Sequence, residues 1–497
     1  MTPCGWNLID VVNADLHHRR MLYSLLTRKI GFLFFILSAF PLFAGTMEIK
    51  IHSDLPIAET GNSERVAIFN SRKSRKSEAK VWVTIEKKPI PRKEFILVEP
   101  PKAEWSHGNV WRVEDVFDDK GGIDQFSKLV VLDKDSDWGK EDKFSATVTY
   151  YQVREHPLPP KRDGSPADNG PYFAGSDTKS LVVVAPEVSL ESVTFNHVPG
   201  NSDSDGIDLR KSYSDPDFVG PEWSLAGTQP VAYRAGVRPT VKVDFKIRPS
   251  RLNRVRAKAE ESGMGLTWGI SESWSTSSSG IFSGVTAVSP QIDKGDVSWK
   301  WAVTGFNGVP AYGWDDVRTT TVSVYKILGQ PQSPWKEGAG TQKPWTDALD
   351  FAIEKCGTKG IKDPLRALYF ATKYLHKKPY QEVSSCYYSK GLLESIFLYS
   401  DYMKNGRVNC FDSAYGLSLT SRLLGVPLVG IKHEPFVTSV AAFTLHCYTC
   451  YEDRIIFDSC SAIPEEFCLG LLKDVYLSSV EKKEFEFISE IYSYEIN

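Results

Sequence analysis

The amino-acid sequence predicts a multidomain fold in which two N-terminal all-β domains precede an α+β domain. Its length of 497 residues corresponds to about three domains. Segments of alternating β-branched and aromatic residues recur as far as Ile327, and helical periodicity begins after residue 344. The chain is therefore expected to bury several separate cores.

The composition excludes two broad classes of protein. Apolar residues make up 41% of the chain and charged residues 24%, which is typical of globular proteins and not of disordered ones. The 59 basic and 62 acidic side chains give a formal charge of −3. Because no excess of positive charge is present to attract a polyanion, we expect no nucleic-acid partner.

The N-terminal region predicts export. An apolar run at residues 30–44 has the length of a signal-peptide core, is preceded by basic residues and ends in alanine. Met21 is then the expected start, with residues 1–20 an upstream start artefact and residues 21–44 the signal peptide. The alternative is an uncleaved N-terminal anchor. The cleaved chain is expected to be secreted or periplasmic, without membrane association.

A first β domain is expected over residues 45–178. Residues Lys80–Ile85 and Phe144–Val153 alternate in the manner of half-buried strands. The stretch Glu155–Tyr172 is rich in Pro, Gly, Asp and Asn, which is typical of a long loop or a linker. We therefore place a domain boundary near this stretch.

A second β domain is expected over residues 179–330. Its strand-like runs are separated by turn-forming residues, as in an immunoglobulin-like sandwich. Trp299 and Trp301 lie on one face of their strand, where they either stack on a sugar or, as we favour, fill the core. The runs are Ser180–Val184, Thr240–Ile247, Val297–Val303 and Thr319–Ile327.

A linker at residues 331–344 leads to the α+β domain, expected over residues 345–497. Asp363 is a suitable N-cap for one of its helices, with a proline at the first helical position. The first three helices are expected at Trp345–Lys355, Lys362–His376 and near Lys390–Met403.

Cys410 lies at the predicted start of a further helix. Asn409 is a suitable N-cap, Gly425 a suitable C-terminal residue, and Pro427 prevents continuation. The amides and positive dipole of a first helical turn favour thiolate over thiol, which makes a cysteine nucleophilic. The alternative is a buried structural thiol.

A β-hairpin is predicted further along the chain, with strands at 442–451 and 455–459 around the turn 452–454. A three-residue turn places His446 diagonal to Asp458 on one face of the hairpin. A two-residue turn shifts the register by one residue and places these side chains on opposite faces. A catalytic imidazole-carboxylate contact therefore requires the three-residue turn.

Two alternatives exist for this imidazole. His446 is either a catalytic base or a core histidine, and the order Cys410, His446, Asp458 favours the base. The competing pair is His433 and Asp453. His433 precedes a loop that contains proline, and Asp453 lies in the turn itself, so this pair lacks a comparable geometry.

Together these segments resemble the transglutaminase-like superfamily, whose core is a papain-like, cysteine-catalysed fold. The resemblance covers roughly Trp345 to Leu471, and it implies that Cys410 is the nucleophile, His446 the general base, and Asp458 the group that orients the imidazole. The backbone N–H of Cys410 is the one oxyanion donor that we nominate. The matching segments are Gly406 to Cys410, Leu424-Gly425-Val426-Pro427, His446-Cys447-Tyr448 and Asp458.

Cofactors are not expected. Two acidic stretches, 133–137 and 201–206, begin like calcium loops, but Phe144 and Ser212 occupy the positions where a bidentate Glu is needed. Cys447 and Cys450 form a C-x-x-C pair, for which a zinc site is the less favoured interpretation, because export favours disulfides. With Cys410 as a thiol, the six candidates for pairing are Cys356, Cys386, Cys447, Cys450, Cys460 and Cys468.

The sequence thus predicts an exported cysteine-dependent acyl-transfer enzyme that hydrolyses peptide or amide bonds in a protein or peptide substrate. The β domains are expected to position the catalytic domain or to bind a cell-envelope partner. One alternative is an inactive cell-envelope binding or scaffold protein. Another is a true protein cross-linking transglutaminase.

Overall fold

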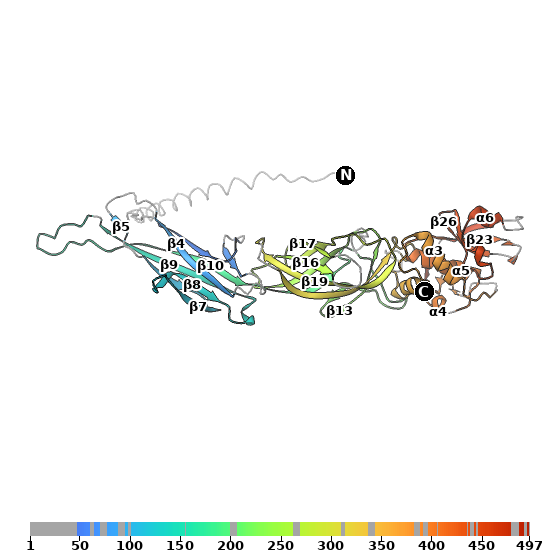
Figure 1. Cartoon of the computed structure of the whole chain (residues 1–497), viewed down its shortest axis with the longest axis horizontal. Helices are drawn as coiled ribbons and strands as arrows, with labels where there is room; N and C mark the ends of the chain where they lie inside the picture. Colours follow the sequence, from blue (N-terminus) through green and yellow to red (C-terminus); the bar gives the residue numbers. More distant parts are fainter. Residues whose placement is uncertain are drawn as a thin grey trace, which may run out of the picture.

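The computed structural model describes most of the chain beyond the N-terminal region. Figure 1 shows an elongated molecule, with β-sheets over most of its length and mixed helices and strands at the C-terminal end. The expected signal peptide lies outside the described residues. Those described are 47–59, 64–69, 77–87, 95–97, 101–154, 156–198, 206–261, 269–309, 314–335, 343–381, 388–390, 396–404, 406–434, 436–437, 442–443, 446–478, 487–491 and 495–496.

The first unit consists of two β-sheets that share one core. Its strands are β1 (Met47–Ser53), β2 (Ile57–Glu59), β3 (Arg65–Ile68), β4 (Glu78–Lys87), β5 (Phe95–Leu97), β6 (Lys102–Ser106), β7 (Arg112–Phe117), β8 (Ile123–Val131), β9 (Lys140–Arg154) and β10 (Tyr172–Ala185). One sheet has the order β1-β4-β8-β7 and the other β2-β3-β10-β9-β5, with β6 also paired to β9. Ile51 and Val81 of the first sheet are buried in one apolar cluster with Val148 and Val183 of the second. Ile51, Val81 and Val148 each lie between less buried neighbours, which is the alternation that the sequence pattern predicts for half-buried strands.

The first domain boundary differs from the expected one. Strands β9 and β10 form a long hairpin, in which Tyr172 pairs with Gln152 and Ala185 pairs with Lys140. Residues 156–171 therefore belong to the tip of a hairpin and do not link two units. The expected boundary after residue 178 falls inside β10, and the junction lies at Pro186 instead. Turn-forming residues mark both hairpin tips and linkers, so composition alone did not distinguish them.

The second unit also consists of two sheets around one core. Its strands are β11 (Glu187–Thr194), β12 (Trp223–Ser224), β13 (Gly227–Thr228), β14 (Val231–Arg234), β15 (Thr240–Arg248), β16 (Val255–Glu261), β17 (Ile270–Trp274), β18 (Ser279–Ser283), β19 (Asp293–Phe306) and β20 (Asp315–Ile327). The sheet orders are β13-β12-β11-β15-β18 and β14-β20-β19-β16-β17. Trp299 and Trp301 are fully buried between the sheets, and Phe195 stacks on Trp299 with ring centroids 5.1 Å apart. The two tryptophans are core residues and not a sugar platform.

The third unit combines helices with a mixed set of short strands. Its helices are α2 (Thr346–Asp350), the π-helix η3 (Phe351–Lys355), α3 (Pro364–Leu375), α4 (Tyr399–Lys404), α5 (Cys410–Leu423), the 3₁₀ turn η5 (Glu465–Phe467) and α6 (Lys473–Ser478). Its strands are β21 (Ser389–Lys390), β22 (Ile396–Phe397), β23 (Val429–Glu434), β24 (Phe436–Val437), β25 (Ala442–Phe443), β26 (His446–Tyr451), β27 (Ile455–Phe457), β28 (Leu469–Leu472), β29 (Phe487–Ile491) and β30 (Glu495–Ile496). The main sheet has the order β28-β27-β26-β23-β29.

Three of the expected helices agree with the structure, and the fourth is shorter than expected. The helix after the linker is α2 continued by η3, and the Asp363 side chain accepts a hydrogen bond from the Arg366 amide at the start of α3. The helix expected near Lys390–Met403 is limited to α4, because the described residues before it include the short strands β21 and β22. Within the described part of the chain, no helix has both the length and the apolar character needed to cross a bilayer.

The second and third units are tied together along helix α5. The Leu328 amide donates to the Leu424 carbonyl at 3.1 Å, and the Trp335 indole donates to the Leu419 carbonyl at 2.9 Å. A side chain at Gly425 would lie 2.2 Å from the backbone of Gly329. The close approach at the C-terminal end of α5 therefore requires glycine. These contacts fix the helix whose other end carries Cys410.

Candidate active site

Cys410 is the first residue of α5, as the capping pattern predicts. The Asn409 side chain accepts from the Asp412 amide at 3.0 Å, and the Asp412 carboxylate accepts from the Asn409 amide at 3.1 Å. This reciprocal arrangement is a capping box that satisfies two amides at the helix start. Asn409 and Asp412 are buried, and Cys410 is 5% exposed. The thiol therefore lies at the positive end of a rigid helix.

His446 begins strand β26, which pairs with β23 on one side and β27 on the other. Tyr451 pairs with Ile455, so the hairpin has the three-residue turn on which the sequence interpretation depended. The turn residues Glu452 and Asp453 adopt φ values of 49° and 54°. Asp is among the residues that enter this left-handed region most readily, so the turn forms without glycine.

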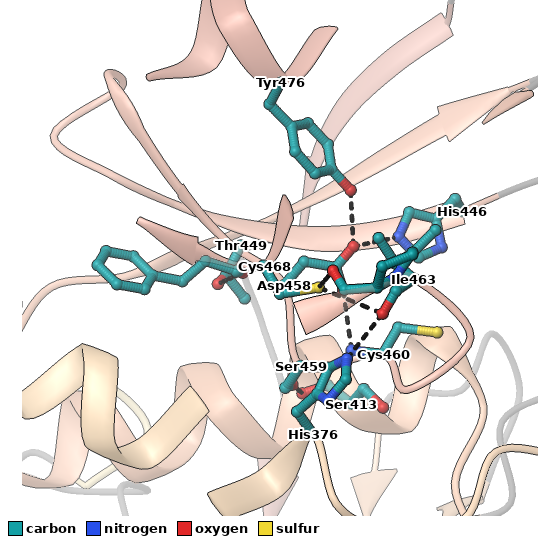
Figure 2. Close-up of polar contacts among 12 residues, drawn as sticks. His376, Ser413, His446, Thr449, Asp458, Ser459, Cys460, Ile463, Cys468 and Tyr476 are labelled. Atoms are coloured by element: carbon teal, nitrogen blue, oxygen red, sulfur yellow. Dashed lines mark hydrogen bonds and ion pairs between the residues drawn. The ribbon is translucent and has the colours of Figure 1, made fainter. Parts of the chain in front are cut away.

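Asp458 follows β27 directly and contacts the imidazole. Its Oδ2 lies 2.6 Å from His446 Nε2, and the two side chains are 1% and 0% exposed. Figure 2 shows the ring and the carboxylate facing each other across the hairpin. Because Nε2 is bonded to Asp458, Nδ1 is the ring nitrogen that remains for the thiol.

The loop that carries Asp458 is anchored on two helices (Figure 2). The Ser459 hydroxyl donates to the Ser413 carbonyl in α5 at 2.8 Å. His376 Nε2, at the end of α3, donates to the Ile463 carbonyl at 2.7 Å. The carboxylate is thereby fixed relative to the helix that begins at Cys410.

The surroundings of Cys410 stabilise its thiolate. A hydrogen bond from the Cys447 side chain is the largest effect, and together with His446 it outweighs burial and lowers the pKa of Cys410 to about 5. Burial lowers the pKa of His446, but the negative charges of Asp458 and Cys410 raise it to about 10. The two shifts are in opposite directions, and together they favour a thiolate beside an imidazolium.

Cys447 and Tyr476 are contacts that the sequence interpretation missed. Tyr476 in α6 donates its hydroxyl hydrogen to Asp458 Oδ2 at 2.6 Å, and the Cys460 amide donates to Oδ1 at 2.9 Å. The C-x-x-C pattern points to a disulfide or a zinc site for Cys447 and gives no sign of its contact with Cys410. No local pattern marks Tyr476, because its contact depends on how α6 packs against the sheet.

The competing pair does not assemble. Asp453 is 79% exposed and bonds to Lys473 at 2.6 Å. His433 lies within β23 and pairs in register with His446, a proximity that the sequence interpretation did not foresee. Of the two histidines, His446 is the one that contacts Asp458.

The expected disulfides are absent from the described cysteines. Cys386 lies outside the described residues, and none of the other candidates forms a disulfide. Four of these thiols are buried in apolar clusters of the third unit, where cysteine packs as a small hydrophobic residue: Cys356, Cys450, Cys460 and Cys468. Among the described residues, no group of three or more His, Cys, Asp or Glu side chains is arranged to hold a metal ion.

Comparisons with known proteins leave the family open. No family model and no curated protein matches the sequence. One solved structure that aligns is the crystal structure of red sea bream transglutaminase, with a TM-score of 0.24 and 9% sequence identity over 50% of this chain and 49% of that chain. Since this likeness is so low, the function must be argued from the site.

Proposed function

We propose that the protein is a cysteine-dependent acyl-transfer enzyme that hydrolyses peptide or amide bonds. The observation that carries the proposal is the buried His446–Asp458 bond beside a cysteine at a helix start. A buried charged pair is costly unless it is well bonded, and perturbed groups of this kind concentrate at functional sites. The roles are nucleophile for Cys410, acid and base for His446, and orienting group for Asp458.

The proposed reaction has two steps. The Cys410 thiolate attacks the amide carbonyl and forms a C–S bond, and the His446 imidazolium gives its proton to the leaving amine as the C–N bond breaks. Water then attacks the thioester while neutral His446 accepts a proton from it. The C–S bond breaks, the carboxylic acid leaves, and the thiolate-imidazolium pair is restored.

Hydrolysis is favoured over transfer to an amine because water is the default acceptor of a thioester. Transamidation requires a site that excludes water while admitting an amine. We further propose export of the cleaved chain, on the basis of residues 21–44, and a positioning or envelope-binding role for the β units. The resemblance to transglutaminase-like enzymes is part of the same proposal.

The test offers the purified chain a peptide library and, separately, glutamine-containing casein with a fluorescent primary amine. We expect new peptide termini that are absent with the Cys410→Ala variant. Amine incorporation without new termini would overturn hydrolysis in favour of cross-linking. If an acyl-amide probe leaves Cys410 unlabelled and both assays are silent, the scaffold alternative is correct.

A further inference from the structure

The Asp458 carboxylate receives hydrogen bonds on both oxygens, from strand β26, from helix α6 and from its own loop. His446 Nε2 and the Tyr476 hydroxyl both lie 2.6 Å from Oδ2, and the Cys460 amide lies 2.9 Å from Oδ1. Figure 2 shows the imidazole and the phenol converging on one carboxylate oxygen from different sides. Rotation about the last torsion of an aspartate is otherwise soft, so these donors determine which oxygen faces His446.

Tyr476 is itself held rigidly at this point. It is 1% exposed, and its ring packs against that of Tyr448 with centroids 5.1 Å apart. Helix α6 begins at Lys473, whose amide donates to the Arg454 carbonyl in the β26–β27 turn at 2.7 Å. The helix that carries the phenol is therefore tied to the hairpin that carries His446.

The phenol of Tyr476 remains a hydrogen-bond donor. Burial, followed by the charge of Asp458, raises the pKa of Tyr476 well above its ordinary value. Its hydroxyl therefore keeps its proton and directs it to the carboxylate. A hydrogen bond to an ionised group is stronger than one between neutral groups.

We propose that Tyr476 is a positioning residue whose hydroxyl locks Asp458 in the orientation that holds His446 toward Cys410. This inference rests on the proposed function, and it adds a fourth residue to the three that the sequence indicated. The hydrogen bond from the hydroxyl also reduces the effective negative charge on the carboxylate, which weakens the attraction between Asp458 and the imidazolium. Loss of the hydroxyl should therefore strengthen this attraction and disturb the geometry of the His446–Asp458 contact.

The test uses iodoacetate, a small anionic reagent whose attack on Cys410 depends on both the thiolate and the imidazolium. The alkylation rate of the full chain is measured against pH, and mass spectrometry identifies the modified residue. The variants are Tyr476→Phe, Asp458→Asn and the double variant. Tyr399→Phe is the matched control, because Tyr399 is equally buried but bonds to Thr420 at 2.7 Å.

For Tyr476→Phe we expect the alkaline limb of the alkylation profile to move up by about half to one pH unit, which corresponds to the net contribution of one typical hydrogen bond. Tyr399→Phe should leave the alkaline limb of the alkylation profile unchanged. In the Asp458→Asn background, Tyr476→Phe should add no shift, because its effect passes through the carboxylate. Tyr476→3-fluorotyrosine introduces a stronger hydrogen-bond donor of nearly the same volume, so it should move the alkaline limb down. This variant replaces Tyr476→Phe in the test if the Phe variant does not fold.

Two results would overturn the inference. One is a Tyr476→Phe profile that coincides with that of the parent chain, and the other is a shift of equal size in the Asp458→Asn background. If iodoacetate does not modify Cys410 in the parent chain, the proposed function itself fails. The two failures are therefore distinguishable.

Discussion

Two segments of the third unit each place a buried cysteine at the end of a helix, with opposite consequences. Cys356 follows the end of the α2–η3 helix and is 2% exposed, whereas Cys410 begins α5 and is 5% exposed. Burial raises the pKa of Cys356 far above its ordinary value, while the surroundings of Cys410 lower its pKa to about 5. Burial is therefore not what distinguishes them.

The difference lies in the direction of the helix and in the neighbours of the thiol. A helix C-terminus presents carbonyl groups and negative charge, which oppose a thiolate, and an N-terminus presents amides. Cys410 also has hydrogen bonds with Cys447 and His446, whereas Cys356 has only the charge of Lys378 to oppose its burial, and burial prevails. A reactive cysteine thus requires the right helix end together with polar partners.

The largest expected effect comes from removing the base. His446→Ala should lower the rate of Cys410 alkylation near neutral pH by about 100-fold or more, because the thiolate loses its counterion and its proton acceptor. Cys356→Ala and His433→Ala should leave the rate near that of the parent chain. Equal losses for the two histidine variants would mean that His446 is not the base.

The next effect comes from the orienting carboxylate. Asp458→Asn should reduce activity less than His446→Ala, because the imidazole remains. Since the negative charge of Asp458 raises the pKa of His446 to about 10, its removal should lower that pKa and move the alkaline limb of the pH profile down. An alkaline limb that stays in place would contradict the ion pair.

A smaller effect is expected from the second thiol. Cys447→Ala removes the largest stabilising contact of the Cys410 thiolate, so the pKa of Cys410 should rise and the acid limb should move up. The loss should be several-fold at about pH 6 and slight at higher pH, where the thiol is ionised in any case. Cys450→Ala, in the same strand and also buried, is the matched control and should leave the acid limb unchanged.

The smallest effect is expected at the helix cap. Asn409→Ala should cost about 1 kcal/mol of unfolding free energy, the usual value for a lost N-cap. It should move the acid limb up only slightly, because the amides and partners of Cys410 remain. Denaturant unfolding and the alkylation profile measure the two effects separately. A large loss of reactivity without a loss of stability would assign Asn409 a direct role.

Much of the site was predictable because it rests on local patterns. Asn409 and Gly425 mark the ends of α5, and the turn after Tyr451 fixes the register that brings His446 to Asp458. Tyr476 was not predictable, since its bond to Asp458 spans 18 residues and depends on tertiary packing. The tip of the β9–β10 hairpin has the composition of a linker, so its sequence predicts a linker where the structure has a hairpin.

The expected disulfides were wrong for a different reason. They followed from the predicted export and not from any geometry in the sequence. The described cysteines instead serve as small apolar residues or, at Cys447, as a thiol donor to Cys410. A predicted compartment is therefore a weaker guide to cysteine pairing than the geometry of the cysteines themselves.

The most direct test of the central claim compares the two helix-end cysteines in one sample. The native chain is treated briefly with iodoacetamide at about pH 6.5, well below the ordinary pKa of a thiol, and the sites are identified by mass spectrometry. We predict modification of Cys410 with Cys356 intact, and loss of that selectivity in His446→Ala. An unmodified Cys410, or equal modification of both cysteines, would contradict a thiolate at Cys410.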